Sequence, residues 1–233
     1  MSGDKFLIIF NHYKYEQWRQ KNFKQPSVRL GTYQDVRSLE GTFRNLGFVV
    51  DTYDDCTYDE IEVHLKNMCE KDHSNTSCVA VAVMTHGFDT YLSSSDIVYP
   101  VADITSLLGT APSLAKKPKL FFIQACREGH ILHPTPPHDE DNVAGDEVYI
   151  PKVEPDCLLL YSTYEDHVAY RKCGSWLMQA LCAVIDAHHG SMNLTRMATL
   201  VNKKVAAEST GFRNGGYKQM SVVESDLKKF LMF

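Results

Sequence analysis

Apolar residues occur in this sequence in two patterns that alternate along the chain. The first pattern is a short, nearly uninterrupted apolar run, such as CVAVAVMT at residues 78–85. Runs of this kind are typical of parallel strands that are buried on both faces. They therefore predict a central sheet covered by helices. The runs lie at residues 5–11, 48–53, 78–85, 119–126 and 156–163, and a last strand-like stretch lies at 221–223.

The second pattern is a helical stripe between successive runs. Within residues 31–46, Val36, Leu39 and Phe43 recur at three- and four-residue spacing, which places them on one face of a helix. Gly47 follows, and glycine commonly ends a helix. The same reasoning predicts further helices at residues 57–72, 101–108, 175–188 and 193–208.

The order of strands and helices predicts one α/β domain over residues 1–233. Strands that alternate with helices form a mostly parallel sheet with helices on both faces. We therefore expect three layers, α/β/α, around a central sheet of six strands. The sequence contains no internal repeat and no second compositional region that would indicate another domain.

Composition and motifs exclude several classes of function. The formal net charge of −5 argues against nucleic acid or an anionic membrane as the main partner, and no apolar run reaches the roughly 18 residues that a membrane span needs. Seven cysteines without CxxC spacing predict neither a disulfide framework nor a zinc site, and they favour a reducing cytosol. The absence of HExxH, GxGxxG and GxxxxGK[ST] argues against a metal site and a nucleotide-binding domain. We expect no cofactor.

Residues 128–155 interrupt the alternation of strands and helices. This segment holds five of the nine prolines and the acidic cluster 139–141. Loops of this length are uncommon in compact domains, and exposed loops of this composition are where proteases cut. A tolerated surface insertion is the alternative interpretation.

Candidate catalytic residues follow two of the predicted strands. His86 and Gly87 come after residues 78–85, and Gln124 and Cys126 end the run at 119–126. Ligands bind beyond the carboxyl ends of strands in an open parallel sheet, so neighbouring strands would bring the imidazole and the thiol together. Cysteine catalysis requires a thiol beside a base. Taken singly, however, a cysteine is often a core thiol and a histidine is often structural.

Several separated motifs resemble the caspase family of cysteine proteases. FFIQAC at 121–126, preceded by His-Gly at 86–87, resembles the family's nucleophile signature. Other matches are SVRLGT at 27–32, PSLAKKPKLFFIQAC at 112–126, YST at 161–163 followed by Tyr170-Arg171 and GSW at 174–176, and VNKKVA at 201–206. Because the chain starts almost at its first predicted strand, we expect it to lack a recruitment domain, as in executioner-like members with short prodomains.

The resemblance implies a role for each matched residue. Cys126 would be the nucleophile and His86 its acid–base partner, while the backbone N–H groups of Gly87 and Cys126 would form an oxyanion hole. Arg29, Arg171 and Gln124 would line the pocket for the residue before the cut, and two guanidinium groups select aspartate. The outer substrate-binding positions would be Tyr170 as an aromatic wall, Trp176, and Val168, which loosens selection in the next pocket.

An aspartate-specific enzyme gives the segment 128–155 a function as a cleavable linker. Asp139, Asp141 and Asp146 are candidate cut sites. Cutting there would divide a large-subunit region, about 1–141, from a small-subunit region, about 147–233. The uncut chain would be a poorly active zymogen.

The sequence departs from the family pattern at Glu128, where the family usually has glycine, and near the last predicted strand. Family dimers pair this strand, here 221–227, with its twofold mate. Like charges that face one another across strands are destabilising, so Glu224 predicts a weak or pH-sensitive homodimer, or a preference for another partner. Alternatively, Glu224 points to solvent because the register differs.

We interpret the chain as a cytoplasmic, aspartate-specific cysteine endopeptidase that acts in programmed cell death or inflammatory signalling. Its partners would be protein substrates, a second subunit and inhibitor proteins, but neither nucleic acid nor membrane. The remaining alternative is a catalytically weak homologue that regulates a partner caspase by binding it.

Overall fold

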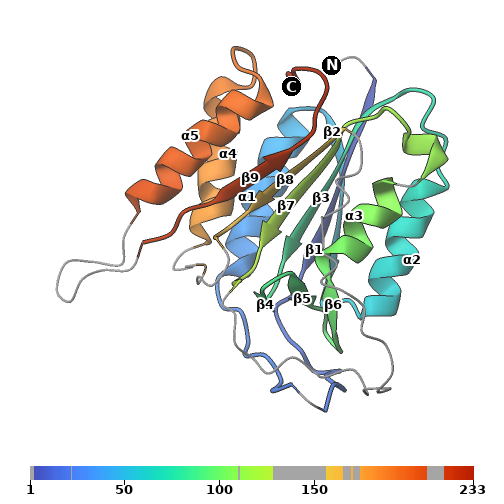
Figure 1. The fold of residues 1–233 in the computed structure, drawn as a ribbon, viewed down its shortest axis with the longest axis vertical. Coiled ribbons are helices and arrows are strands. Elements are labelled where there is room, and N and C mark those ends of the chain that lie inside the picture. The colour runs from blue at the N-terminus through green and yellow to red at the C-terminus, as the bar shows by residue number, and fades with distance from the viewer. Residues whose placement is uncertain are drawn as a thin grey trace, which may run out of the picture.

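A computed structural model describes residues 3–21, 23–109, 111–127, 156–164, 169, 174–208 and 218–233. Six strands form the central sheet in the order β2-β1-β3-β7-β8-β9 (Figure 1). The first five strands are parallel and β9 is antiparallel to β8, so the predicted, mostly parallel six-stranded sheet is confirmed. The strands are β1 (Asp4–Asn11), β2 (Phe48–Asp54), β3 (Thr76–Met84), β7 (Lys119–Gln124), β8 (Cys157–Tyr161) and β9 (Val222–Ser225).

Helices cover both faces of this sheet and complete the three layers (Figure 1). One hydrophobic core lies under α1 (Thr32–Asn45), α4 (Trp176–His188) and α5 (Leu194–Ala207). The other lies under α2 (Tyr58–Cys69) and α3 (Val101–Gly109), with the short 3₁₀ helix η1 (Pro112–Leu114) beside it. Successive residues of each central strand point to opposite cores, which is why these strands read as continuous apolar runs.

The helical stripe of α1 packs as predicted. Val36, Leu39 and Phe43 are all buried in the core. Gly31 and Gly47 flank the helix with φ values of +84° and +80°, a backbone region that favours glycine. The helix at 57–72 is shorter than predicted, because α2 ends at Cys69.

Three short strands were not predicted. β4 (Gly87–Phe88), β5 (Tyr91–Ser93) and β6 (Val98–Pro100) form a small antiparallel sheet at the carboxyl ends of the parallel strands (Figure 1). Strands of two or three residues are too short to show an alternating pattern. The run at 119–126 also ends earlier than predicted, so Cys126 lies two residues beyond β7.

Several of the cysteines lie in the hydrophobic core. Cys78, Cys157 and Cys182 are buried core residues, as predicted, and they are free thiols. Among the helices of the described residues, none has both the length and the apolar character that crossing a membrane requires.

Candidate active site

The carboxyl ends of β3 and β7 bring the two candidate catalytic residues to one edge of the sheet. Met84 is in register with Gln124, and the Thr85 N–H donates to the Gln124 carbonyl at 3.0 Å, so the pairing continues one residue past β3. A Cβ built on Gly87 would lie 3.1 Å from the Cys126 carbonyl oxygen. The prediction that these strands are neighbours is therefore confirmed, and the segment 86–87 packs directly against the backbone of Cys126.

His86 makes one hydrogen bond through its ring and another through its backbone. Its Nε2 lies 2.9 Å from the Ser27 carbonyl oxygen, and because a carbonyl only accepts, Nε2 is the donor. In the neutral ring Nδ1 is then the acceptor nitrogen, which is the form that a general base needs. The His86 backbone N–H donates to the Tyr15 hydroxyl at 3.1 Å, and the centroids of the His86 and Tyr15 rings lie 5.5 Å apart.

Cys126 differs from the core thiols in its surroundings. It is half-buried, and its Sγ accepts a hydrogen bond from the Ala169 N–H at 3.4 Å. Burial raises the pKa of the Cys78 and Cys182 thiols to about 12 in each case. Thiols with such a high pKa are not nucleophiles at neutral pH. Cys126 instead lies two residues beyond β7, at the sheet edge where His86 follows β3.

Arg29 lies fully buried behind this edge. Its Nη1 shares two hydrogens among three acceptors, which are the His12 carbonyl at 2.9 Å, the Met84 carbonyl at 2.7 Å and Thr32 Oγ1 at 3.0 Å. The two carbonyls belong to the ends of β1 and β3, so the guanidinium group is held between two strands of the sheet. Gln124 is also buried, and its Oε1 has no hydrogen-bond partner among the described residues.

A buried carboxylate connects the Arg29 region to the start of α4. Asp35, in the first turn of α1, accepts hydrogen bonds from the Ser175 N–H at 2.9 Å and from Gln179 Nε2 at 2.8 Å. Burial raises the pKa of Asp35, while these hydrogen bonds and the charge of Arg29 act in the opposite direction. The half-buried Trp176 follows Ser175 and begins α4, so its backbone position depends on this contact.

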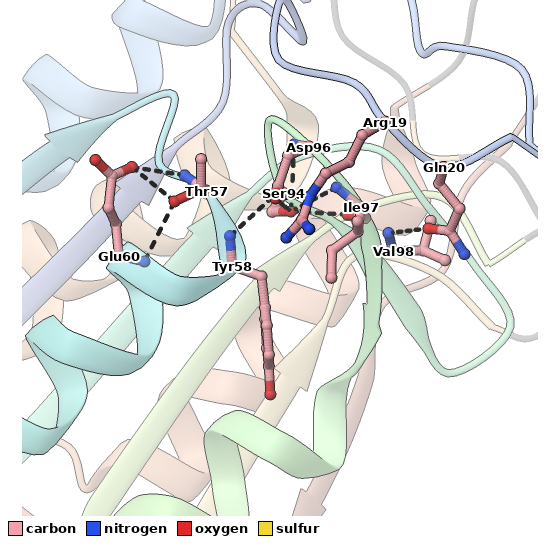
Figure 2. Close-up of polar contacts among 9 residues, drawn as sticks. All are labelled: Arg19, Gln20, Thr57, Tyr58, Glu60, Ser94, Asp96, Ile97 and Val98. Carbon is pink, nitrogen blue, oxygen red and sulfur yellow. Dashed lines mark hydrogen bonds and ion pairs between the residues drawn. The ribbon is translucent and has the colours of Figure 1, made fainter.

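Polar contacts fix the loop that runs from β1 to α1 and carries Ser27. Figure 2 shows Arg19 and Gln20 of this loop lying over Asp96 and Val98. Arg19 Nε donates to Asp96 Oδ2 at 2.8 Å, and the Val98 N–H donates to Gln20 Oε1 at 2.6 Å. Asp96 also accepts from the Tyr58 N–H at the start of α2 at 2.9 Å. Burial alone raises the pKa of Asp96, but its hydrogen-bond donors outweigh burial and lower it.

Part of the predicted site lies outside the described residues. This part comprises the substrate-binding residues Val168, Tyr170 and Arg171, the candidate cut sites Asp139, Asp141 and Asp146, and Glu128. The structure adds contributors that sequence reasoning missed, namely Ser27, Tyr15, Asp35 and Asp96. Ser27 acts through a backbone oxygen, which no side-chain motif can reveal.

Glu224 lies in β9, at the edge of the sheet. It is half-buried and stands opposite Leu159 of β8 in the antiparallel register. The structure holds one chain, so pairing of β9 with a second copy stays a prediction.

Comparison with known proteins identifies relatives along almost the whole chain. The family model described as the caspase domain matches residues 4–232. The chain is 35% identical to Caspase-1 of Drosophila melanogaster, over 86% of this chain and 62% of that protein. It is 34% identical to Caspase-7 of Gallus gallus, over 91% and 74% respectively. The crystal structure of Caspase-1 from Spodoptera frugiperda superposes with a TM-score of 0.80 at 29% identity, covering 99% of this chain and 90% of that chain.

Proposed function

Since the chain belongs to the caspase domain family, we propose that it is a cysteine endopeptidase that cleaves proteins after aspartate in programmed cell death. Caspases are aspartate-specific cysteine proteases, and the family match covers residues 4–232, nearly the whole chain. The observation that supports the proposal is that His86 and Cys126 follow the ends of two neighbouring strands, with His86 Nε2 donating to the Ser27 carbonyl.

In the proposed mechanism, Cys126 attacks the carbonyl carbon of the scissile peptide. His86 takes the thiol proton at Nδ1 and returns a proton to the leaving amine, which releases the first product and leaves an acyl-enzyme. Water then attacks the thioester with His86 again as base, the C–S bond breaks to release the second product, and His86 returns the proton to the Cys126 thiolate. As the imidazole becomes positively charged, the Ser27 carbonyl dipole stabilises it through Nε2. The N–H groups of Gly87 and Cys126 would bind the oxyanion, and the packing of Gly87 against Cys126 supports this role.

Selection of aspartate rests on Arg29 and Gln124, together with Arg171 from the sequence motif. A guanidinium group binds a carboxylate through two parallel hydrogen bonds, and a buried one does so with little screening by water. Arg29 is fully buried and Gln124 has an unsatisfied amide oxygen within the described part of the chain. The side-chain amide can present either its oxygen or its NH₂ group, and the latter would donate to a substrate carboxylate.

Activation would follow cleavage at Asp139, Asp141 or Asp146. The two products would stay together, because β7 and β8 come from opposite sides of the linker and pair in one sheet. The contact of Asp35 with Ser175 also joins the two sides. We propose further that two copies associate through β9, that the enzyme is cytoplasmic, and that inhibitor proteins bind it.

Hydrolysis of matched peptides that end in Asp, Asn, Glu or Arg tests the proposal. We expect the Asp peptide to be cleaved at least about 100-fold faster than the Asn peptide, because the Asn peptide leaves buried charge unpaired. Cys126→Ala should abolish cleavage, whereas Cys69→Ala, which removes another half-buried thiol, should not. The wild-type chain should also run as two fragments and Cys126→Ala as one. A folded wild-type protein without peptidase activity would instead favour the regulatory homologue.

A further inference from the structure

A chain of hydrogen bonds leads from Arg29 through the protein interior to the surface. Arg29 Nη1 lies 3.0 Å from Thr32 Oγ1, which lies 2.5 Å from Asn11 Oδ1. Asn11 Nδ2 in turn lies 2.7 Å from Asp54 Oδ1. The first three residues are fully buried and Asp54 is exposed. The chain thus crosses the first turn of α1 and the carboxyl ends of β1 and β2.

The two ends of this chain fix the direction of every hydrogen bond in it. A guanidinium group can only donate, so the Thr32 hydroxyl must accept from Arg29 and donate its own proton to Asn11 Oδ1. A carboxylate can only accept, so the Asn11 amide must turn its NH₂ group toward Asp54. Neither Thr32 nor Asn11 can rotate its side chain without breaking two hydrogen bonds. Aligned bonds of this kind polarise and strengthen one another in a buried site.

We propose that Thr32 and Asn11 are positioning residues that hold Arg29 in the orientation that binds the substrate aspartate. The inference rests on the proposed function of Arg29 and adds to it the groups that set its geometry. The other acceptors of Nη1 are the backbone carbonyls of Met84, the last residue of β3, and His12, which directly follows β1. Thr32 adds a side-chain acceptor from the helix that follows the Arg29 loop, so it restricts how the guanidinium plane turns about these carbonyls.

Thr32→Val tests the role of the hydroxyl, because valine has nearly the same shape and no hydroxyl group. Thr42→Val is the matched control, since Thr42 is a buried threonine of the same helix whose side chain contacts Cys182 instead. We expect Thr32→Val to raise KM for the Asp peptide about tenfold and to lower the Asp-over-Asn preference by a similar factor, the size expected for one hydrogen bond to a charged group. Thr42→Val should change neither.

Two further readouts separate positioning from a general loss of structure. Alkylation of Cys126 by iodoacetamide needs the thiol but not the aspartate pocket, so Thr32→Val should alkylate at the wild-type rate, with kcat little changed. Asp54→Ala breaks the chain at its exposed end, where the fold tolerates change, and should lower the Asp-over-Asn preference about twofold to threefold. Asp51→Ala removes the same charge from the same strand and is its control.

Each outcome bears on one proposal only. A wild-type enzyme without preference for Asp over Asn contradicts the proposed function itself. A wild-type enzyme that prefers Asp, with Asp54→Ala and folded Thr32→Val both matching it in KM and selectivity, overturns the positioning role alone. If Thr32→Val does not fold, the Asp54→Ala selectivity decides, and an unchanged ratio there also overturns it.

Discussion

Replacement of His12 by phenylalanine should make the protein less sensitive to mild acid. His12 is fully buried, and neither of its ring nitrogens has a hydrogen-bond partner among the described residues. Burial, and then the positive charge of Arg29, lower the pKa of His12 from 6.5 to about 3, although Asp96 acts in the opposite direction. The folded protein therefore keeps this imidazole neutral at a pH where the unfolded chain protonates it.

The sign and the size of the effect follow from these two pKa values. Well above pH 6.5 the ring is neutral in both states, so His12 adds no pH dependence there. As the pH falls from 6.5 toward 3, only the unfolded chain takes up the proton, and each pH unit lowers the free energy of unfolding by up to about 1.4 kcal/mol. Between pH 7.5 and pH 5.0 the loss through His12 is about 2 kcal/mol, or roughly 4–8 °C in Tm for a chain of this length.

The assay is urea denaturation at both pH values in a Cys126→Ala background, which excludes self-cleavage. The His12→Phe variant should lose about 2 kcal/mol less than its parent between pH 7.5 and 5.0. Tyr99→Phe is the control, because it removes a buried hydroxyl without a partner among the described residues, and burial raises the pKa of Tyr99 far above this range. Equal losses for His12→Phe and its parent would refute the reasoning, since they would mean that His12 takes up its proton in the folded state.

Two other pairs of variants test the site and the loop that supports it. Gly87→Ala would place a Cβ 2.6 Å from the Tyr91 carbonyl oxygen and 3.1 Å from the Cys126 carbonyl oxygen, so kcat should fall at least about tenfold. Gly41→Ala is the control. Because open space surrounds Gly41 inside α1, this change should stabilise the helix by about 0.5–1 kcal/mol without loss of activity. Asp96→Ala should lower the free energy of unfolding by about 2–4 kcal/mol, because it leaves the Tyr58 N–H and the Ser94 hydroxyl without their acceptor. Arg19→Ala should lower it by under about 1 kcal/mol, because the Arg19 side chain is 61% exposed. Urea denaturation measures both values, and equal losses would contradict the view that Asp96 is the central acceptor of these contacts.

The parts of the fold that the sequence could predict are those in which one physical effect dominates. Val36, Leu39 and Phe43 must share a core face at their spacing, so α1 was predictable from periodicity alone. Uninterrupted apolar runs likewise predicted the parallel strands. The antiparallel sheet β4-β5-β6 was missed, since strands of two or three residues are too short to show an alternating pattern.

The candidate site was also predictable only in part. The sequence shows which chemical groups are present, but it does not show how they are oriented. His86 and Cys126 could be predicted because each follows an apolar run, and parallel strands end at the same edge. The orientation of His86 depends on Ser27, a backbone acceptor in a loop without hydrophobic periodicity. That loop is held by Arg19 on Asp96 and by Tyr15 on Thr85, which are separated by 77 and 70 residues in the chain. Polar contacts between such distant residues leave no local signature, yet they determine whether the imidazole offers the correct nitrogen to the thiol. The proposed catalytic pair is therefore only as well oriented as these distant contacts allow.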